Sequence, residues 1–245
     1  MKIADGVEAL EITVNLMGRQ TTIYPTLIWD RETVILVDAG FAGLEQKIQE
    51  AFEKAGVSFG RLNKVILTHQ DIDHTGSLPG ILAKSKHKIE VFASEVEKPY
   101  IEGDKPLVKM DPARRAKMFE TIPEEQRKRL EAAFSSPPKS KVDVTIEDGE
   151  ELPYCGGIII ISTPGHTPGH ISLYHKQSKT LVTGDALIVA DGQLSGPNSS
   201  AAFDIDEANK SLEKLAQYDI ETIICYHGGV YKENAQQQIF QLANK

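Results

Sequence analysis

Short apolar segments in two blocks, each followed by helical segments, constrain the fold of this chain most. The first block has strand-like segments at 9–16, 24–29, 33–37, 64–67 and 89–93, and helical spacing of apolar residues at 44–55 and 77–83. The second block has strand-like segments at 157–161, 171–174 and 180–183, followed by a helix, a strand and a helix at 206–217, 221–225 and 232–243. This order predicts two sheets packed face to face with helices outside.

The segment between residues 95 and 141 interrupts this pattern. It is charged, with proline-led helices predicted at 112–120 and 123–134, and the run Ser135-Ser136-Pro137-Pro138 closes it. We interpret it as a helical insertion over the sheet edge, although a solvated helical hairpin without a role is the alternative. Because the sequence shows no repeat or linker, we expect residues 1–245 to form a single domain.

Composition excludes several classes of partner. With 27 Lys and Arg against 35 Asp and Glu, the net charge of −8 repels phosphate backbones, so we expect no nucleic-acid partner. Asp5, Glu8 and Glu11 interrupt the stretch that a signal peptide would need, and no run of about 18–20 apolar residues suits a membrane helix. We therefore expect a cytoplasmic protein that does not bind membranes. Cys155 and Cys225 lie beside apolar runs and are expected to be buried, reduced thiols.

Four potential metal ligands follow the predicted strand at 64–67, in the run His69-Gln70-Asp71-Ile72-Asp73-His74. A strand that ends and turns into a helix can direct His69 and Asp71 one way while the turn presents Asp73 and His74 another way. Such a loop could serve two adjacent metal ions. Taken alone, the run could also be a helix N-terminus whose acidic residues interact favourably with the helix dipole.

Three further strand ends carry His or Asp beside turn residues. His166 lies in Thr163-Pro164-Gly165-His166-Thr167-Pro168-Gly169-His170, where Gly and Pro fix a tight turn. Asp185 follows a strand in Thr183-Gly184-Asp185, and His227 follows a strand in Cys225-Tyr226-His227-Gly228-Gly229. Each motif is weak alone, but together the four motifs point to a shared metal site.

These motifs resemble those of the metallo-β-lactamase superfamily, which run Asp, His-x-His-x-Asp-His, His, Asp and His. The corresponding residues are Asp38, the run from His69 to His74, His166, Asp185 and His227. The Thr-Pro-Gly-His turn is most similar to the glyoxalase II and lactonase-like branches. The resemblance covers the chain apart from the insertion and implies the α/β class, with an αββα sandwich of two mixed β-sheets flanked by helices.

The resemblance also implies a role for each residue. One metal site would consist of His69, Asp71 and His166, and the other of Asp73, His74 and His227, with Asp185 between them. Asp38 would orient ligands rather than bind metal, and His170 would be the packing histidine of the family. His87 and His175 match no motif and lie in polar stretches, so we expect them at the surface.

Asp71 stands where most of the superfamily has the second His of its second motif. A carboxylate in place of an imidazole makes the site harder and more anionic, which shifts its preference from zinc toward iron or manganese. The cofactors expected are therefore two divalent transition-metal ions, zinc, iron or manganese. The di-iron flavodiiron enzymes of the same superfamily carry a glutamate at this place.

The function implied is dinuclear metal-dependent hydrolysis of a small-molecule ester, thioester, lactone, amide or phosphoester by a hydroxide that bridges the metals. Asp73 would be the catalytic carboxylate that orients the hydroxide and moves its proton. Lactonase activity is disfavoured, because Ala186 and Leu187 follow Asp185, where the lactonase-like branch often has a Tyr. Two alternatives stay open: a di-iron redox protein related to flavodiiron enzymes, and a non-catalytic binding module with structural metals. The sequence does not determine the oligomeric state.

Overall fold

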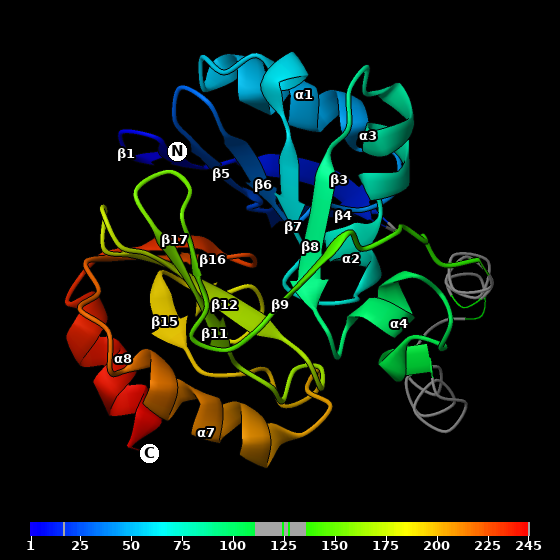
Figure 1. The fold of residues 1–245 in the computed structure, drawn as a ribbon. Coiled ribbons are helices and arrows are strands. Elements are labelled where there is room, and N and C mark those ends of the chain that lie inside the picture. Colours follow the sequence, from blue (N-terminus) through cyan, green and yellow to red (C-terminus); the bar gives the residue numbers. More distant parts are fainter. Residues whose placement is uncertain (17, 111–123, 125–126, 128–135, 245) are drawn as a thin grey trace.

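Two mixed β-sheets packed face to face form the centre of the computed structural model, which describes residues 1–16, 18–110, 124, 127 and 136–244 (Figure 1). In the first sheet, the strand pairs are antiparallel up to β6 and parallel from β6 to β9. Its strands, in spatial order, are β1 (Lys2–Ala4), β2 (Val7–Ala9), β5 (Thr26–Trp29), β6 (Val34–Val37), β7 (Lys64–Ile66), β8 (Glu90–Ser94) and β9 (Val144–Ile146).

The second sheet is antiparallel except for the parallel pair of β13 with β16. Its strands, in spatial order, are β10 (Glu151–Leu152), β11 (Ile158–Ser162), β12 (Ile171–His175), β13 (Thr180–Val182), β16 (Thr222–Cys225) and β17 (Gly229–Tyr231). Strands β11, β13 and β16 run in one direction, so their carboxyl ends meet at the same edge. Two hairpins flank the sheets, β3 (Ile12–Leu16) with β4 (Arg19–Ile23) and β14 (Ile188–Ala190) with β15 (Gln193–Ser195).

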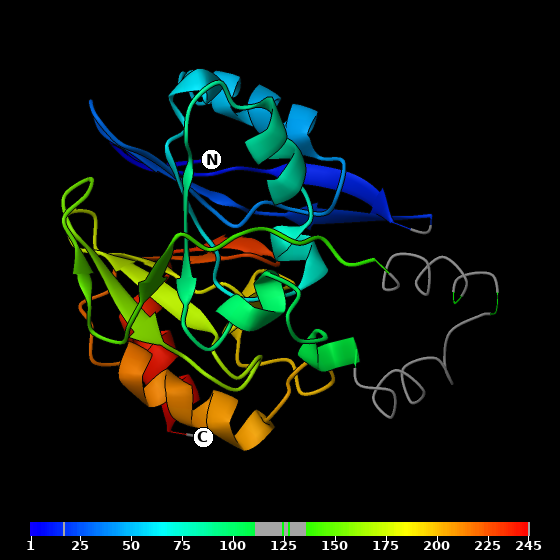
Figure 2. The same ribbon diagram turned by 45° about the vertical axis from the view of Figure 1, so that its right-hand side comes forward.

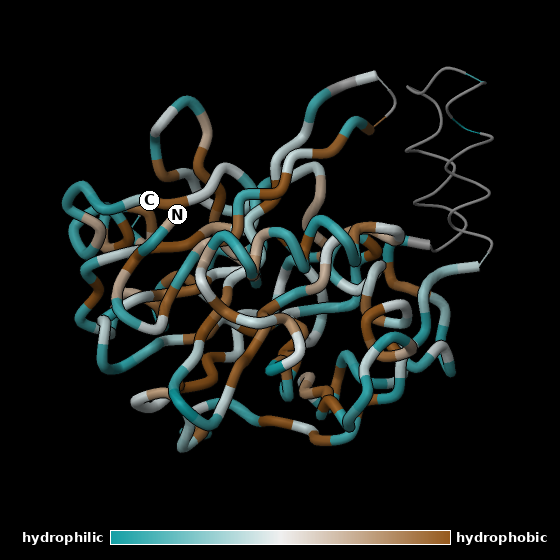
Figure 3. Tube along the Cα trace, turned by 90° about the horizontal axis from the view of Figure 1, so that it is seen from above, coloured by the Kyte–Doolittle hydropathy of each residue, from teal (hydrophilic) through white to brown (hydrophobic). Residues whose placement is uncertain are grey.

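Helices cover the outer face of each sheet (Figures 1 and 2). The first sheet is covered by α1 (Glu45–Lys54) and α3 (Leu78–Lys84), and the second by α7 (Ile205–Leu215) and α8 (Ala235–Ala243). Helix α1 buries Ile48 and Phe52, which lie four residues apart on one helical face. Hydrophobic and hydrophilic stretches alternate along the trace, as expected for elements with one face toward a core (Figure 3). The predicted αββα architecture is confirmed.

Alternating side chains of the central strands serve two cores. In β6, Leu36 packs with the α1 residues Ile48 and Phe52, whereas Ile35 belongs to the core between the sheets. In β16, Ile224 belongs to the same inter-sheet core and Ile223 packs with α7 and α8. Full burial of such a side chain contributes about 1.5–3 kcal/mol. Because both faces of these central strands are buried, the strands are continuous apolar runs in the sequence.

Several short elements differ from the expectation. The segment 9–16 divides between β2 and β3, and the polar stretch that follows it forms β4 against β3. The last helix begins at Ala235 rather than at residue 232, because β17 pairs with β16 and Asn234 adopts a left-handed φ of 49°. Strands β1, β9, β10, β14 and β15 have only two or three residues, too few for a periodic pattern.

The predicted insertion connects β8 to β9. Its described part contains α4 (Lys98–Ile101) and the 3-10 turn η2 (Val108–Met110). The helices predicted at 112–120 and 123–134 lie outside the described residues. None of the described helices combines the length and apolar composition needed to cross a membrane.

Candidate metal centre

Seven side chains with metal-binding chemistry gather where the carboxyl ends of strands from both sheets meet. On the first sheet, the loop after β7 carries two of them, and the short helix α2 (Ile72–Thr75) carries two more. On the second sheet, the loops after β11, β13 and β16 carry one each. They form two groups, His69, Asp71, His166 and Asp185, and Asp73, His74 and His227.

In the first group, the Asp71 carboxylate lies between two imidazoles. Its Oδ2 is 3.2 Å from His69 Nε2 and 3.1 Å from His166 Nε2, and His166 Nε2 is 3.2 Å from Asp185 Oδ2. Ligand atoms about 2.0–2.2 Å from a tetrahedral metal ion are roughly 3.3–3.6 Å apart. The spacing of this group therefore suits a single transition-metal ion.

The second group lies beside the first, and Asp185 contacts both. Asp73 Oδ2 is 3.2 Å from His227 Nε2 and 3.7 Å from His74 Nε2. Asp185 is 3.4 Å from His74 Nε2 through Oδ1 and 3.5 Å from His227 Nε2 through Oδ2. Since its Oδ2 also faces His166, the Asp185 carboxylate lies between the two groups.

Asp38 holds the far nitrogen of His74 directly and that of His69 through Thr68. Asp38 Oδ2 accepts hydrogen bonds from His74 Nδ1 at 2.8 Å and from Thr68 Oγ1 at 2.9 Å, and Oδ1 accepts from the Thr68 backbone N–H at 2.9 Å. Because the Thr68 hydroxyl donates to Asp38, it accepts from His69 Nδ1, which is 2.9 Å away. Both rings thus turn Nε2 toward the centre, and in its neutral form each ring keeps its proton on Nδ1 and offers the Nε2 lone pair there.

Three buried atoms at the centre lack a hydrogen-bond partner among the described residues: His69 Nε2, His74 Nε2 and Asp185 Oδ1. Leaving such an atom unpaired costs about 1–3 kcal/mol. A cation held in each group would pair these atoms, because His69 Nε2 belongs to the first group, and His74 Nε2, with Asp185 Oδ1 beside it, to the second. The donor set, which consists of imidazole nitrogens and carboxylate oxygens, fits a transition-metal centre.

The electrostatics of the cluster also favour cations. Burial lowers the pKa of His69 to about 4, so its imidazole is neutral. Burial would also lower the pKa of His74, but the carboxylates of Asp38, Asp185 and Asp73 raise it well above its ordinary value. Burial opposes charge on His227 as well, yet Asp185 and Asp73 raise its pKa to about 10. Positive charge is therefore stabilised around Asp185 and Asp73.

His170 and Gly184 fix the backbone of Asp185. His170 is buried, its Nε2 accepts from the Asp185 backbone N–H at 3.0 Å, and its Nδ1 faces Thr163 Oγ1 at 2.8 Å. Gly184 has a φ of 51°, and a Cβ there would lie 2.7 Å from His170 Nε2. A glycine is therefore required for this close approach, and His170 has the packing position expected for it.

Two groups that contact the loops of the cluster, Glu97 and Lys109, have no motif in the sequence that would point to them. Glu97 has 0% exposure; its Oε2 accepts from the Gln70 backbone N–H and side chain at 2.9 and 2.8 Å, and its Oε1 accepts from the Gly169 N–H at 2.7 Å. Burial raises the pKa of this carboxyl group. The ammonium of Lys109, in η2, contacts Asp71 Oδ2 and lies 2.7 Å from His166 Nε2.

The two remaining histidines differ in placement. His87 is exposed, as predicted. The surface position predicted for His175 is wrong: its side chain is buried, with Nε2 donating to the Cys155 carbonyl at 2.5 Å and Nδ1 2.6 Å from Ser178 Oγ. The loop before β11 covers this end of β12. Cys155 and Cys225 are free and buried, as predicted, and burial raises the pKa of each thiol to about 12.

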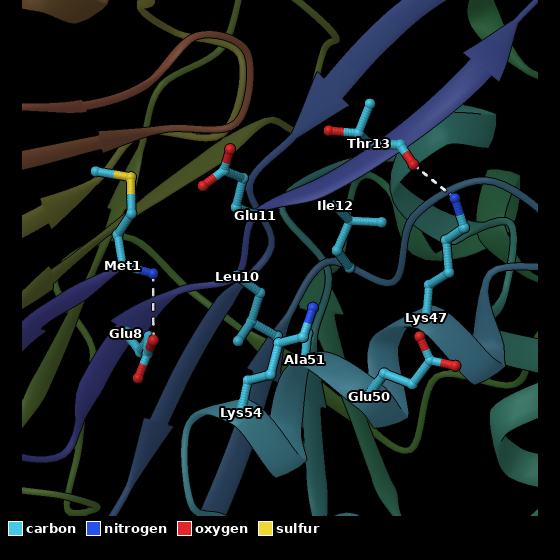
Figure 4. A pocket seen from close by; sticks show the side chains of 10 residues that line it. All are labelled: Met1, Glu8, Leu10, Glu11, Ile12, Thr13, Lys47, Glu50, Ala51 and Lys54. Atoms are coloured by element: carbon cyan, nitrogen blue, oxygen red, sulfur yellow. Dashed lines mark hydrogen bonds and ion pairs between the residues drawn. The ribbon is translucent and has the colours of Figure 1, made fainter.

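A cavity of about 490 Å³ lies away from this centre (Figure 4). The start of β3 and one side of α1 line it, with Glu11, Lys47, Glu50 and Lys54 among its charged residues. Lys47 Nζ donates to the Thr13 carbonyl at 2.6 Å across it. None of the seven clustered residues lines this cavity, so we assign it no part in the chemistry.

Comparison with known proteins agrees with the fold and the motifs. The family model of the metallo-beta-lactamase superfamily matches residues 19–227. The chain therefore belongs to this superfamily, and the resemblance expected from the sequence is confirmed.

Its relatives include enzymes named for hydrolysis. It is 30% identical over 226 residues to the probable metallo-hydrolase YflN of Bacillus subtilis, covering 86% of this chain and 81% of that protein. It is 29% identical over 170 residues to the hydroxyacylglutathione hydrolase GloC of Haemophilus influenzae, covering 66% and 65%. A metallo-beta-lactamase family protein of Thermus thermophilus has the same fold, with a TM-score of 0.74 and 21% identity over 99% of this chain and 80% of that one.

Proposed function

We propose that the chain is a dinuclear metal-dependent hydrolase. Its first site would be held by His69, Asp71 and His166, and its second by Asp73, His74 and His227, with Asp185 bridging. The single observation that carries this proposal is the position of Asp185, whose carboxylate lies 3.2 to 3.5 Å from imidazoles of both groups. We take the chain as one domain with an insertion at about 95–141, of whose described part η2 lies beside the site.

The two ions, when bound, would supply Lewis acidity for the scissile carbonyl or phosphoryl oxygen and would make a water acidic enough to ionise near neutral pH. The residues of the chain would orient the imidazoles and move the proton. Asp38 and Thr68 hold His74 and His69 with their lone pairs inward. Asp73, whose side chain is 20% exposed, would accept the proton of the attacking water and return it to the leaving group.

The substrate class is a small molecule with an ester, thioester, lactone, amide or phosphoester bond. A thioester is the first to test, because GloC is named for that reaction and matches this chain over 170 residues. Neither thiol of the chain competes as a nucleophile, since both are buried with a pKa near 12.

The test combines elemental analysis with a substrate panel. Protein purified without a metal-chelating tag should contain close to two transition-metal ions per chain and should hydrolyse at least one thioester, ester, lactone or phosphodiester. His166→Ala and His227→Ala should each lose metal from the site to which that histidine belongs, and turnover with it, whereas the exposed control His87→Ala should keep its metals and turnover. Iron content with redox turnover and no hydrolysis would favour the di-iron alternative, and full metal content without any turnover would favour a binding module.

A further inference from the structure

The turn η2 carries a lysine into the first metal group. Lys109 Nζ contacts Asp71 Oδ2 and lies 2.7 Å from His166 Nε2, and its side chain is only 29% exposed. These are the same two atoms that lie 3.1 Å apart and would face a metal ion in the first site. The Lys109 ammonium therefore contacts two of the atoms that would bind the metal ion at that site.

The position of Lys109 is built into the fold by a chain of hydrogen bonds. The backbone N–H of Val108 donates to Gln70 Oε1 at 2.7 Å, and Gln70 Nε2 donates to the buried Glu97 at 2.8 Å. Gln70 lies between the ligands His69 and Asp71, and Leu107 is buried with 6% exposure. The insertion is thus fixed to the ligand loop at the residue next to Lys109.

One lone pair cannot serve an ammonium proton and a metal ion at once. We propose, on the basis of the proposed function, that the Lys109 ammonium is an internal competitor for the first metal site. A metal ion that binds His69, Asp71 and His166 must displace Lys109 from two of them. The first site is therefore weaker than its ligand set alone would make it, and filling it frees the Lys109 side chain.

Metal affinity tests the competition directly. The His227→Ala background weakens the second site, so that the remaining binding reports the first. In this background, Lys109→Met should tighten binding of Zn²⁺ or Mn²⁺ by at least about tenfold, or about 1.4 kcal/mol, in titrations of chelator-treated protein against a competing chelator. Lys109→Arg, which keeps the charge, should tighten it much less. Lys105→Met, at an exposed lysine of the same insertion, is the matched control and should leave the affinity unchanged.

Amine labelling followed by mass spectrometry gives a second readout that does not depend on activity. In the wild-type protein, Zn²⁺ should increase the labelling rate of Lys109 several-fold and leave that of Lys105 unchanged. Equal affinities in Lys109→Met and Lys105→Met, or a labelling rate of Lys109 that metal does not raise, would overturn the inference while leaving the proposed function intact. If neither the wild type nor Lys109→Met binds metal, the proposed function and the inference both fail.

Discussion

Replacing Asp38 by Asn should weaken the second metal site without unfolding the protein. Asp38 has a left-handed φ of 63°, which Asn adopts more readily than other non-glycine residues. Asn keeps an oxygen for the Thr68 backbone N–H but places an amide donor where Oδ2 now accepts from Thr68 Oγ1 and His74 Nδ1. The hydroxyl can rotate away. The imidazole must move its proton to Nε2, which removes the lone pair that faces Asp185 and Asp73.

Asp38→Asn should lower both the metal affinity and the stability of the fold. Loss of a partner that orients a metal-binding imidazole lowers metal affinity about 10- to 100-fold, equivalent to about 1.4–2.8 kcal/mol. A lost hydrogen bond to a charged group adds about 1.5–3 kcal/mol of lost stability. Rotating the amide by a half turn would not restore the hydrogen bonds. Its NH₂ would then face the Thr68 backbone N–H, which cannot rotate away.

The assay is a Zn²⁺ titration of chelator-treated protein, together with urea unfolding of the same samples. The matched control is Asp30→Asn, because Asp30 also accepts backbone N–H groups, from Glu32 and Thr33, but lies in a turn after β5 that carries no metal ligand. The control should lose stability and keep its metal affinity. An Asp38→Asn protein that binds both ions as tightly as the wild type would refute the role given to Asp38.

Three further outcomes follow from the site and its surroundings. Asp185→Asn should lower the content of both metals and the turnover, because its carboxylate lies between the two groups; elemental analysis that shows unchanged metal would remove Asp185 from the centre. His175→Ala should lower the free energy of unfolding by about 1–3 kcal/mol, because it leaves the Cys155 carbonyl unpaired, yet keep both metals. Metal loss as great as that of His166→Ala would contradict this. Native protein at pH 8 should react with a thiol reagent only after denaturation, since the pKa of both cysteines is near 12; fast labelling of the native protein would show that these thiols are accessible.

The gathering of the seven side chains could be predicted because it depends on local signals. Each motif follows an apolar run that forms a strand, and turn residues such as Gly184 mark where the strand ends. Strands of each sheet that run in one direction bring their carboxyl ends to the same edge, so the motifs converge. Asp71, the departure from the usual His, lies 3.1 to 3.2 Å from two imidazoles and so joins the cluster, while its role as a ligand stays a prediction.

Other features depended on tertiary contacts that leave no local pattern. Glu97 lies in a charged segment, like many exposed acids, and only the packing of two distant loops around it buries its carboxylate. Lys109 is one lysine among several in the insertion, and its place in the site depends on the bond from Val108 to Gln70. His175 has polar neighbours in the sequence, but the backbone of Cys155, twenty residues earlier, closes over it.

Assembly of the centre depends on docking the two sheets. The first sheet supplies four of the clustered side chains and the second supplies three, and contacts of 3.1 and 3.2 Å cross between them, from Asp71 to His166 and from Asp73 to His227. The docking is fixed near the site by the backbone bond from Tyr24 to the Tyr226 carbonyl and by the bond from the Tyr226 hydroxyl to the Asp73 carbonyl. The inter-sheet core, with Ile35 and Ile224, lies behind these contacts. Because the ligands come from both halves, an ion held between them would bind the docked state and not the unfolded chain, and its binding free energy would add to the stability of the fold.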